Sequence, residues 1–377
     1  MNPAGNSHRL VSLDAFRGFT IAAMLLVNNP GDWSRLYAPL AHAKWNGWTF
    51  TDTVFPFFLF IGGVAMTLSL GQRARHGADK GALLRKLAGR AAIIFLIGFC
   101  LNLIPKFDFS SVRLFGVLQR IALCTVLAAP LVIYCSWRKQ LLAILALLAL
   151  YSALMLGVTV PDAYGVLHTG SLAAGEDTGA WLDRLLFSGH LWVQSKTWDP
   201  EGLLSTLPAV CSLLFGVLAG HVLAARMQAV SRVLLLAAAG AACLVTGLVL
   251  DAVFMPINKS LWTVSYCIFM TGWALLAFAA FYYVLDVLAS RSARWLATPL
   301  LMYGMNALFL FALSGLIAKM LGFIKPGGQS LKAVLYAPLQ SLPLAPQMQS
   351  LLFAVWFNAL MLGIAWLLWR KRWFIKV

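Results

Sequence analysis

Long apolar stretches alternate with short polar segments along the whole chain. Residues 141–156, LLAILALLALYSALML, are apolar on every face, whereas a strand of a membrane barrel alternates polar and apolar positions. About 20 apolar residues in a helix cross a hydrocarbon core of ~30 Å. The pattern predicts an all-α, polytopic membrane helix bundle with about ten transmembrane helices, at about residues 15–31, 53–71, 86–104, 114–135, 139–160, 203–224, 231–254, 262–285, 298–321 and 350–369.

The segments between these stretches indicate one transmembrane domain over residues 1–377. Two longer polar segments, at about 161–202 and 322–349, fall on the same side of the membrane. The first is rich in Trp, Leu and charged residues, so we expect it to be an ordered loop that caps the bundle. The second is expected to form a short amphipathic or re-entrant piece. The polar start of the chain shows no cleavable signal peptide, so we expect the first helix to be retained.

Composition and charge give the orientation. The 377 residues are 61% hydrophobic and 11% charged, with a mean hydropathy of +0.81, which excludes a water-soluble core as the main structural solution. Most of the basic residues lie in loops on the side that both termini share, and this bias predicts that both termini are cytoplasmic. The net charge of +16 therefore reflects topology and attraction to anionic membrane lipid, and no nucleic-acid partner is predicted.

The sequence lacks the motifs of a metal site and of several common classes of enzyme. The six cysteines form no CxxC pair, and His168 and His190 have no ligand spacing with His42, so no metal site is predicted. The motifs GxSxG, Walker A and GxGxxG are absent, which argues against a serine hydrolase, a P-loop enzyme and a dinucleotide-binding enzyme.

The densest polar cluster, HAKWNGWTFTD at residues 42–52, stands immediately before the second apolar stretch. His42 is the best candidate for acid–base chemistry, because an unperturbed imidazole has a pKa near ~6.5 and exchanges protons at neutral pH. Asp52 is placed to orient the imidazole, and Asn28, at the end of the first helix, to stabilise an oxyanion. The alternative is a purely structural histidine.

A flat aromatic side chain beside amide and imidazole groups suits a sugar ring, and Trp45 with Asn46 offers this combination next to His42. Other polar residues on the same side extend the predicted substrate-binding set: Asp199, Glu201, Asn258 and Lys259. The two carboxylates of this set either cap the sixth helix or bind an amine.

Ionisable residues inside the apolar stretches need a partner or water. Arg120 is expected about two turns inside the fourth helix, facing the bundle interior. It serves either as a salt bridge that locks two helices or as a clamp for a phosphate or carbonyl group. Asp14 and Arg17, three residues apart at the start of the first helix, are typical of a helix cap and an ion pair.

Several motifs in order along the chain resemble the membrane catalytic domain of the heparan-alpha-glucosaminide N-acetyltransferase family. They are LDAFRG, VNN, HAKWNGWTFTDTVFPFFLFIGG, GVLQR, DRLL, WDPEG, NKSLWTVSY and YGMNALF. The lysosomal member of that family carries an extra N-terminal region and one more membrane span. The resemblance is therefore to the catalytic core, and we expect a bacterial, core-only member in the cell inner membrane, acting on an amino sugar or related glycan.

The resemblance implies transfer of an acetyl group from cytoplasmic acetyl-CoA to a glucosamine amine on the periplasmic side, by a homodimer. It implies that His42 is the active-site histidine and that Asn28 lies with it at the reaction centre. The cofactor channel is expected to involve Arg17, Gln119, Arg120, Ser265, Tyr303 and Asn306. The alternative function is a proton-coupled transporter of an amino sugar or N-acetylated sugar, with His42 and Asp52 as the coupling groups.

Overall fold

The computed structural model describes residues 10–375 as a bundle of helices, with one short pair of strands. Within this part of the chain, nine helical segments are long and apolar enough to cross a membrane, and a bent pair makes ten if it is counted as one span. These segments are α1 (Val11–Asn28), η2 to α3 (Phe50–Arg75), α4 (Lys80–Leu103), α5 (Val117–Tyr134), α6 (Trp137–Gly157), α8 (Thr206–Ala224), α9 (Ala229–Val253), α10 with η4 (Val264–Val287), the pair α12 (Thr298–Met305) and α13 (Ala307–Phe323), and α15 (Pro346–Arg370). The polytopic all-α fold predicted from the sequence is confirmed.

The segment from Phe50 to Arg75 is continuous but changes its helix type along its length. It consists of η2 (Phe50–Thr53), α2 (Val54–Met66), η3 (Thr67–Gly71) and α3 (Gln72–Arg75), where η3 is a π-helix. The remaining elements are η1 (Ala38–Leu40), β1 (Thr159–Pro161), β2 (Leu167–Thr169), α7 (Thr178–Phe187), α11 (Arg291–Leu296), η5 (Pro326–Gly328) and α14 (Leu331–Gln340).

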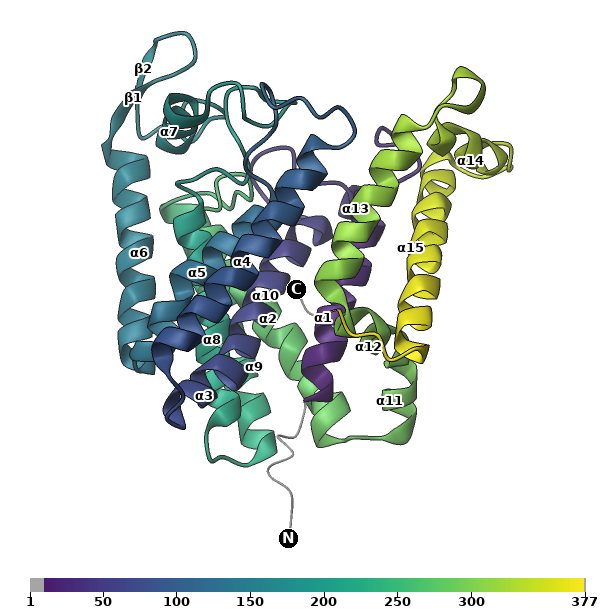
Figure 1. The fold of residues 1–377 in the computed structure, drawn as a ribbon. Helices are drawn as coiled ribbons and strands as arrows, with labels where there is room; N and C mark the ends of the chain where they lie inside the picture. Colours follow the sequence, from purple (N-terminus) through teal and green to yellow (C-terminus); the bar gives the residue numbers. More distant parts are fainter. Residues whose placement is uncertain (1–9, 376–377) are drawn as a thin grey trace.

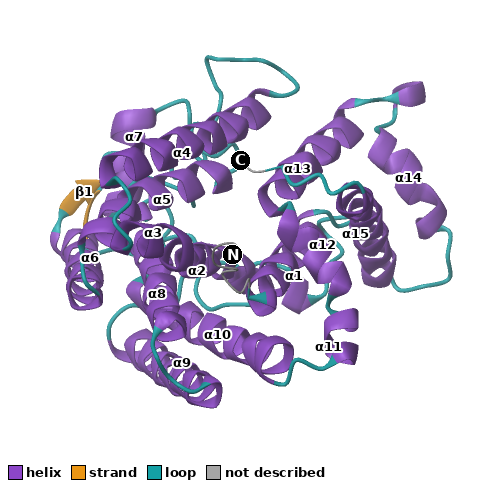
Figure 2. Cartoon of the chain, turned by 60° about the horizontal axis from the view of Figure 1, so that its bottom comes forward, coloured by secondary structure: helices purple, strands orange, loops and turns teal. Residues whose placement is uncertain are grey.

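Two groups of helices make up the bundle (Figures 1 and 2). The larger group contains α2, α4, α5, α6, α8, α9 and α10, and the smaller contains α1, α12, α13 and α15. Helix α1 packs against both α2 and α12. The most buried spans are α2 and α8, while α9 and α4 are largely exposed, as expected for helices that face lipid.

Glycines let the central helices approach each other closely. A Cβ atom added at Gly63 of α2 would lie 1.9 Å from the Leu213 carbonyl oxygen of α8, and one at Gly216 would lie 1.8 Å from the Phe60 carbonyl oxygen. Gly18 of α1 and Gly304 of α12 meet in the same way, with added Cβ atoms 1.7 Å from the Leu300 oxygen and 1.9 Å from the Asp14 oxygen. Small residues at crossings are typical of helix packing in membranes.

The two long polar segments lie at the end of the bundle away from the start of α1 (Figure 1). The first contains β1, β2 and α7, and the antiparallel pair of strands joins Thr159 to Thr169. The second contains α14, which lies against α13 and α15. We call this end of the molecule the outer end.

Two spans differ from the sequence-based expectation. The ninth was expected to be continuous over 298–321, but it bends by 83° between α12 and α13, at Asn306. The fourth was expected to begin at residue 114, but α5 begins at Val117, after extended residues that end at Gly116. Arg120, whose N–H donates to the Gly116 carbonyl, therefore lies in the first turn of α5 and not two turns inside the helix.

Candidate active site

Four segments that are distant in sequence bring polar side chains together at the outer end. They are the approach to α2 (residues 42–52), the segment into the start of α5 (113–120), the loop before α8 (198–205) and the loop into the start of α10 (256–266). Most of the side chains involved are buried, so each charged group needs a partner within the cluster.

His42 and Asp52 form the centre of this cluster. The His42 Nδ1 atom lies 2.7 Å from the Asp52 Oδ1 atom. The His42 side chain is 45% exposed and that of Asp52 is 1% exposed. The pair thus combines an accessible imidazole with a buried carboxylate, the arrangement in which the carboxylate fixes the orientation and tautomer of the ring.

Asp52 is held by its own turn. Its Oδ2 atom accepts hydrogen bonds from the Ala43 N–H at 3.1 Å, the Thr49 N–H at 3.0 Å and the Thr49 hydroxyl at 3.1 Å. Thr49 and Asp52 form a capping box at the start of η2, which explains why a Thr-x-x-Asp sequence stands there. The Tyr266 hydroxyl also donates to the Asp52 carbonyl, at 2.6 Å. Local sequence therefore sets the direction of the carboxylate.

Lys259 is the third member of the centre. Its Nζ atom lies 3.0 Å from Nδ1 and 3.3 Å from Nε2 of His42, and 3.6 Å from the Asp52 carboxylate. Burial lowers the pKa of Lys259, and the negative charges of Asp52 and Glu201 oppose that effect.

An arginine absent from the sequence-based site list connects the predicted carboxylates. Arg113 donates from Nε to Asp199 at 2.8 Å, from Nη2 to Asp199 at 2.5 Å, and from Nη2 to Glu201. Burial alone would raise the pKa of Glu201, but the positive charges of Arg113, Arg120 and Lys259 outweigh it and lower that pKa. Helix α8 begins at Thr206 with Ser205 as its N-cap, so Asp199 and Glu201 do not cap the helix. They neutralise Arg113.

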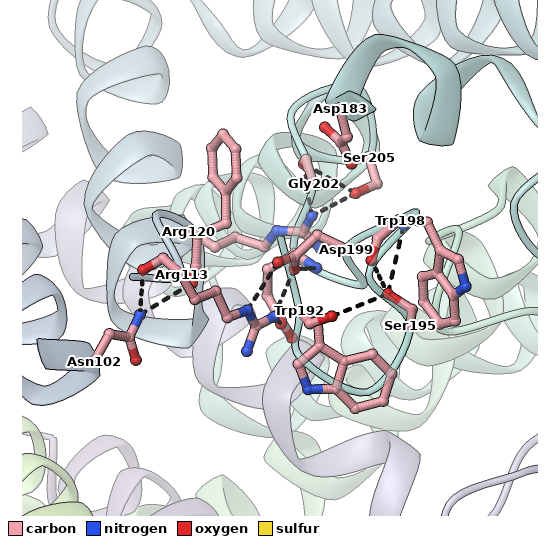
Figure 3. Close-up of polar contacts among 12 residues, drawn as sticks. Asn102, Arg113, Arg120, Asp183, Trp192, Ser195, Trp198, Asp199, Gly202 and Ser205 are labelled. Atoms are coloured by element: carbon pink, nitrogen blue, oxygen red, sulfur yellow. Dashed lines mark hydrogen bonds and ion pairs between the residues drawn. The ribbon is translucent and has the colours of Figure 1, made fainter. Parts of the chain in front are cut away.

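Arg120 is fully buried beside this network (Figure 3). Its Nη2 atom donates to the Gly202 carbonyl at 2.9 Å and to the Ser205 hydroxyl, and its guanidinium lies 5.3 Å from the ring centre of Trp262. Within residues 10–375 it forms no ion pair shorter than 4.0 Å, so the salt bridge considered from the sequence is not observed. Its Nε and Nη1 atoms, and the Nε2 atom of Gln119, find no hydrogen-bond partner among the described residues.

Trp45 connects the segment that carries His42 to the outer loop. Its indole N–H donates to the Leu172 carbonyl at 2.9 Å, and its ring packs edge-on against Trp198, 5.3 Å between centres. Trp198 in turn lies 5.5 Å from Trp192, which lines a cavity of about 750 Å³ at the outer end. A row of indole rings therefore joins the His42 segment to a large cavity.

Other predicted site residues lie near the centre. Asn258 is buried, and its amide donates to the side-chain oxygen of Asn46 at 3.2 Å. The Ser265 hydroxyl is also buried and lies 3.1 Å from the Thr263 hydroxyl. The structure thus places Asn46 and Asn258 in the loops beside His42, and Ser265 in the first turn of α10.

Four predicted residues have their described contacts elsewhere. Asn28 is exposed and lines a cavity of about 260 Å³ with Lys319 and Lys332, and no described hydrogen bond joins it to His42. Arg17 contacts Asp14 at 3.2 Å, as expected for an ion pair at the helix start. The Tyr303 hydroxyl donates to Asn358 on α15.

Asn306, at the bend between α12 and α13, binds the end of the chain. Its side-chain amide donates to the Trp373 carbonyl at 3.1 Å, and its side-chain oxygen accepts from the Ile375 N–H at 2.8 Å. In this structure its amide holds the tail after α15, and its role in a cofactor channel stays a prediction.

Sequence reasoning missed Arg113 although a signal was present. The segment WDPEG carries two acids just before an apolar span, and buried acids need a cation. Residue 113 lies just outside the start of an adjacent span, so it was a candidate partner for these acids.

Comparisons with known proteins agree on one family. The family model described as heparan-alpha-glucosaminide N-acetyltransferase, catalytic, matches residues 9–232, which include three of the four segments of the cluster. Heparan-alpha-glucosaminide N-acetyltransferase of Homo sapiens is 30% identical over 359 residues, covering 80% of this chain and 52% of that protein. The Mus musculus protein of the same name is 30% identical over 362 residues, covering 81% and 53%. The chain thus spans about half the length of the curated relatives it matches.

Proposed function

Because the chain belongs to the heparan-alpha-glucosaminide N-acetyltransferase family, we propose that it transfers an acetyl group from acetyl-CoA to the amine of a glucosamine-type sugar. The observation that carries this proposal is the pair of His42 and Asp52, an accessible imidazole held by a buried carboxylate at 2.7 Å. Such a pair suits the removal of a proton from an attacking amine.

In the proposed reaction the acceptor amine attacks the thioester carbonyl. With Nδ1–H directed at Asp52, the Nε2 atom of His42 accepts the amine proton, and Asp52 stays ionised and keeps the ring in place. Asn28 stays our proposal for the oxyanion donor; a donor of this kind typically lowers the barrier by ~3 kcal/mol. A route through acetyl-histidine is the competing mechanism, and burst kinetics or acetyl label trapped on His42 without acceptor would favour it.

Residues suited to hold the donor are present in the described chain. Arg120 and Gln119 have buried N–H groups without partners, as expected where phosphate or amide oxygens bind. An apolar cavity of about 250 Å³ between α4, α5 and α13, lined by residues such as Ile97, Leu118 and Leu313, has the character to accommodate the pantetheine arm. The basic loops at the other end of the bundle would attract the phosphates of a cytoplasmic donor.

The cavity of about 750 Å³ is our proposed entry for the acceptor. Its polar lining includes Asn102, Gln194 and Lys196, and Trp192 adds an aromatic face suited to a sugar ring. From Trp192 the indole row reaches Trp45, beside His42. An acceptor bound there would approach the imidazole from the outer side.

The same proposal includes the setting of the enzyme. We place it as a homodimer in a bacterial inner membrane, with its donor in the cytoplasm and its acceptor in the periplasm. The family membership supports the chemistry, and the basic loops on the side of the termini support the orientation.

The test uses proteoliposomes with acetyl-CoA inside and glucosamine outside. We expect N-acetylglucosamine to accumulate outside, and His42→Ala to lower the rate by about 100-fold or more, since a general base contributes ~10²–10⁴. His168→Ala is the matched control, because this half-buried histidine at the same end pairs with Asp162 and Glu176 in the outer loop. Glucosamine uptake without acetylation would favour the transporter, and full transfer by His42→Ala would refute the assignment of His42.

A further inference from the structure

We propose that Lys259 is the proton donor to the departing thiolate and that His42 then returns a proton to Lys259. This inference rests on the proposed acetyl transfer and adds a second acid–base group to it. Lys259 entered the sequence analysis as a substrate-binding residue. In the structure it contacts both His42 and Asp52, a position that suits proton transfer as well as substrate binding.

Distances carry the first step of the argument. The Lys259 Nζ atom lies 3.3 Å from the His42 Nε2 atom, the ring nitrogen not directed at Asp52. A proton can pass between atoms at hydrogen-bond distance. The Lys259 side chain is 23% exposed, so it is not closed off completely by its neighbours.

The loop that carries Lys259 is fixed at many points. Asn258 accepts from the Leu261 N–H at 3.0 Å and donates to Asn46, while the Gly47 N–H donates to the Ile257 carbonyl at 2.7 Å. These bonds tie residues 257–261 to the segment that carries His42.

The same loop also contains backbone strain. Trp262 has a φ of +54°, a left-handed conformation that is unfavourable for a bulky residue, and its N–H donates to the Lys259 carbonyl at 3.1 Å. The Thr263 hydroxyl donates to the Pro256 carbonyl at 2.8 Å, which closes the loop on itself. Such strain persists only where the surrounding contacts fix the backbone, so this loop holds Lys259 in one place.

The surroundings of Lys259 set a pKa at which its ammonium group can lose and regain a proton. Asp52 and Glu201 attract the ammonium form, while Arg120 and burial disfavour it, and the balance lowers the pKa of Lys259. His42 faces the same amine. A lysine of lowered pKa is a better proton donor at neutral pH than an exposed one.

The proton balance closes without any further reagent. Attack by the amine forms the C–N bond, and His42 Nε2 takes the amine proton. As the C–S bond breaks, its electron pair stays on sulfur and Lys259 gives that sulfur a proton. The imidazolium then gives its Nε2 proton to the neutral Lys259 amine, so that both groups return to their starting states and the products are amide and thiol.

The experiment varies the leaving group. Initial rates of transfer to glucosamine are measured in detergent with acetyl-CoA and with S-phenyl thioacetate, whose more acidic thiol leaves without a proton donor. We expect Lys259→Met to lower the rate with acetyl-CoA by about 100-fold, within the range for a general acid, and to lower the rate with the aryl thioester by only a few-fold. Lys259→Arg keeps the charge but does not release a proton near neutral pH, so it should stay impaired with acetyl-CoA.

Two comparisons complete the test. Lys44→Met, an exposed lysine in the same segment as His42, should behave as wild type with both donors. In wild type the rate with acetyl-CoA should fall at high pH as Lys259 loses its proton, and Lys259→Met should lack that fall. Circular dichroism melting of each variant checks that it is folded.

The outcomes separate the two proposals. Equal loss with both donors in Lys259→Met, or recovery of the acetyl-CoA rate in Lys259→Arg, overturns the role of Lys259 and leaves the acetyl transfer standing. Wild-type protein that transfers no acetyl group from either donor overturns the proposed function itself.

Discussion

At the residue scale, the Asp52 carboxylate has two roles: it contacts His42, and it accepts hydrogen bonds from nearby residues. Its Oδ1 atom contacts His42, while its Oδ2 atom accepts two hydrogen bonds from Thr49 in its own turn and one from the Ala43 N–H. The turn would position the group even without His42. The histidine therefore receives a partner whose direction is already set.

Replacing Asp52 with Asn should keep the local hydrogen bonds but remove the control of the His42 ring. The amide oxygen can keep the hydrogen bonds of the turn, but the amide N–H₂ would face Nδ1 and favour the wrong ring tautomer. We expect kcat for acetyl transfer to fall by ~10²–10⁴, as for the corresponding change in a Ser-His-Asp triad. Asp32→Asn, a half-buried acid in a turn at the same end, is the control, and an unchanged kcat in Asp52→Asn would contradict this role.

Asp183 of α7 gives the protein a pH-dependent stability. It is buried, and burial raises its pKa to about 7, with the charge of Asp199 adding to the effect and a hydrogen bond from the Leu203 N–H opposing it. An unfolded Asp titrates near ~3.9. Between these values the folded state holds a proton that the unfolded state lacks, so the free energy of unfolding falls as pH rises from about 4 to about 7.

Asp183→Asn imitates the protonated acid and should remove this slope. We expect wild type to lose on the order of a few kcal/mol between about pH 4.5 and about pH 7.5 relative to the variant. The measurement is the difference in thermal midpoint between the two proteins at each pH. Parallel curves of thermal midpoint against pH for the two proteins would contradict the role of Asp183.

At the element scale, the crossing of α2 and α8 depends on one of two adjacent glycines. An added Cβ at Gly63 would lie 1.9 Å from a backbone oxygen of α8, whereas one at Gly62 meets nothing within 4 Å. Backbone atoms cannot turn aside as a flexible side chain can. The two helices must therefore separate if position 63 gains a methyl group.

The two alanine variants form a matched pair. Gly63→Ala should destabilise the protein by about 1–3 kcal/mol or more, as expected for overpacking. Gly62→Ala should be neutral or stabilising by up to ~1 kcal/mol, because alanine favours the helix. Thermal unfolding in detergent measures both, and equal midpoints would show that this crossing does not need a glycine.

The bend between α12 and α13 illustrates how an element depends on a distant one. Asn306 lies at the break, and both polar atoms of its side chain bind the backbone of residues 373–375. These bonds fasten the end of α15 to the ninth span. An isolated apolar pattern cannot reveal a bend that a remote segment stabilises.

At the scale of the whole molecule, the proposed reaction requires a defined orientation in the membrane. The outer loop, where Tyr164 is 92% exposed, and the turn after α3, where His76 is exposed, lie at opposite ends of the bundle. If the basic loops are cytoplasmic, the outer loop faces the periplasm.

Thiol labelling tests this orientation. In a Cys100→Ser background, since Cys100 is exposed, we expect an impermeant maleimide to label Tyr164→Cys in spheroplasts. The variant His76→Cys should react only after the membrane is opened. The reverse pattern would place His42 on the cytoplasmic side and exclude acetyl transfer across the membrane.

The sequence alone determined the membrane fold, because apolar length and helical hydrogen bonding leave a chain few choices in a bilayer. It also determined the pairing of His42 with Asp52 in part, since a capping box within eleven residues is a local feature. Family motifs added the chemistry that a single histidine cannot indicate.

Only the tertiary structure decided the partners of buried charges and the ends of helices. Arg113 meets Asp199 and Glu201 across 86 and 88 residues, and Lys259 meets His42 across 217. Apolar spans are hydrophobic on all sides, so their pattern does not say which helices are neighbours or how they are rotated. The contacts that would make a catalytic centre follow from that packing, which local periodicity does not encode.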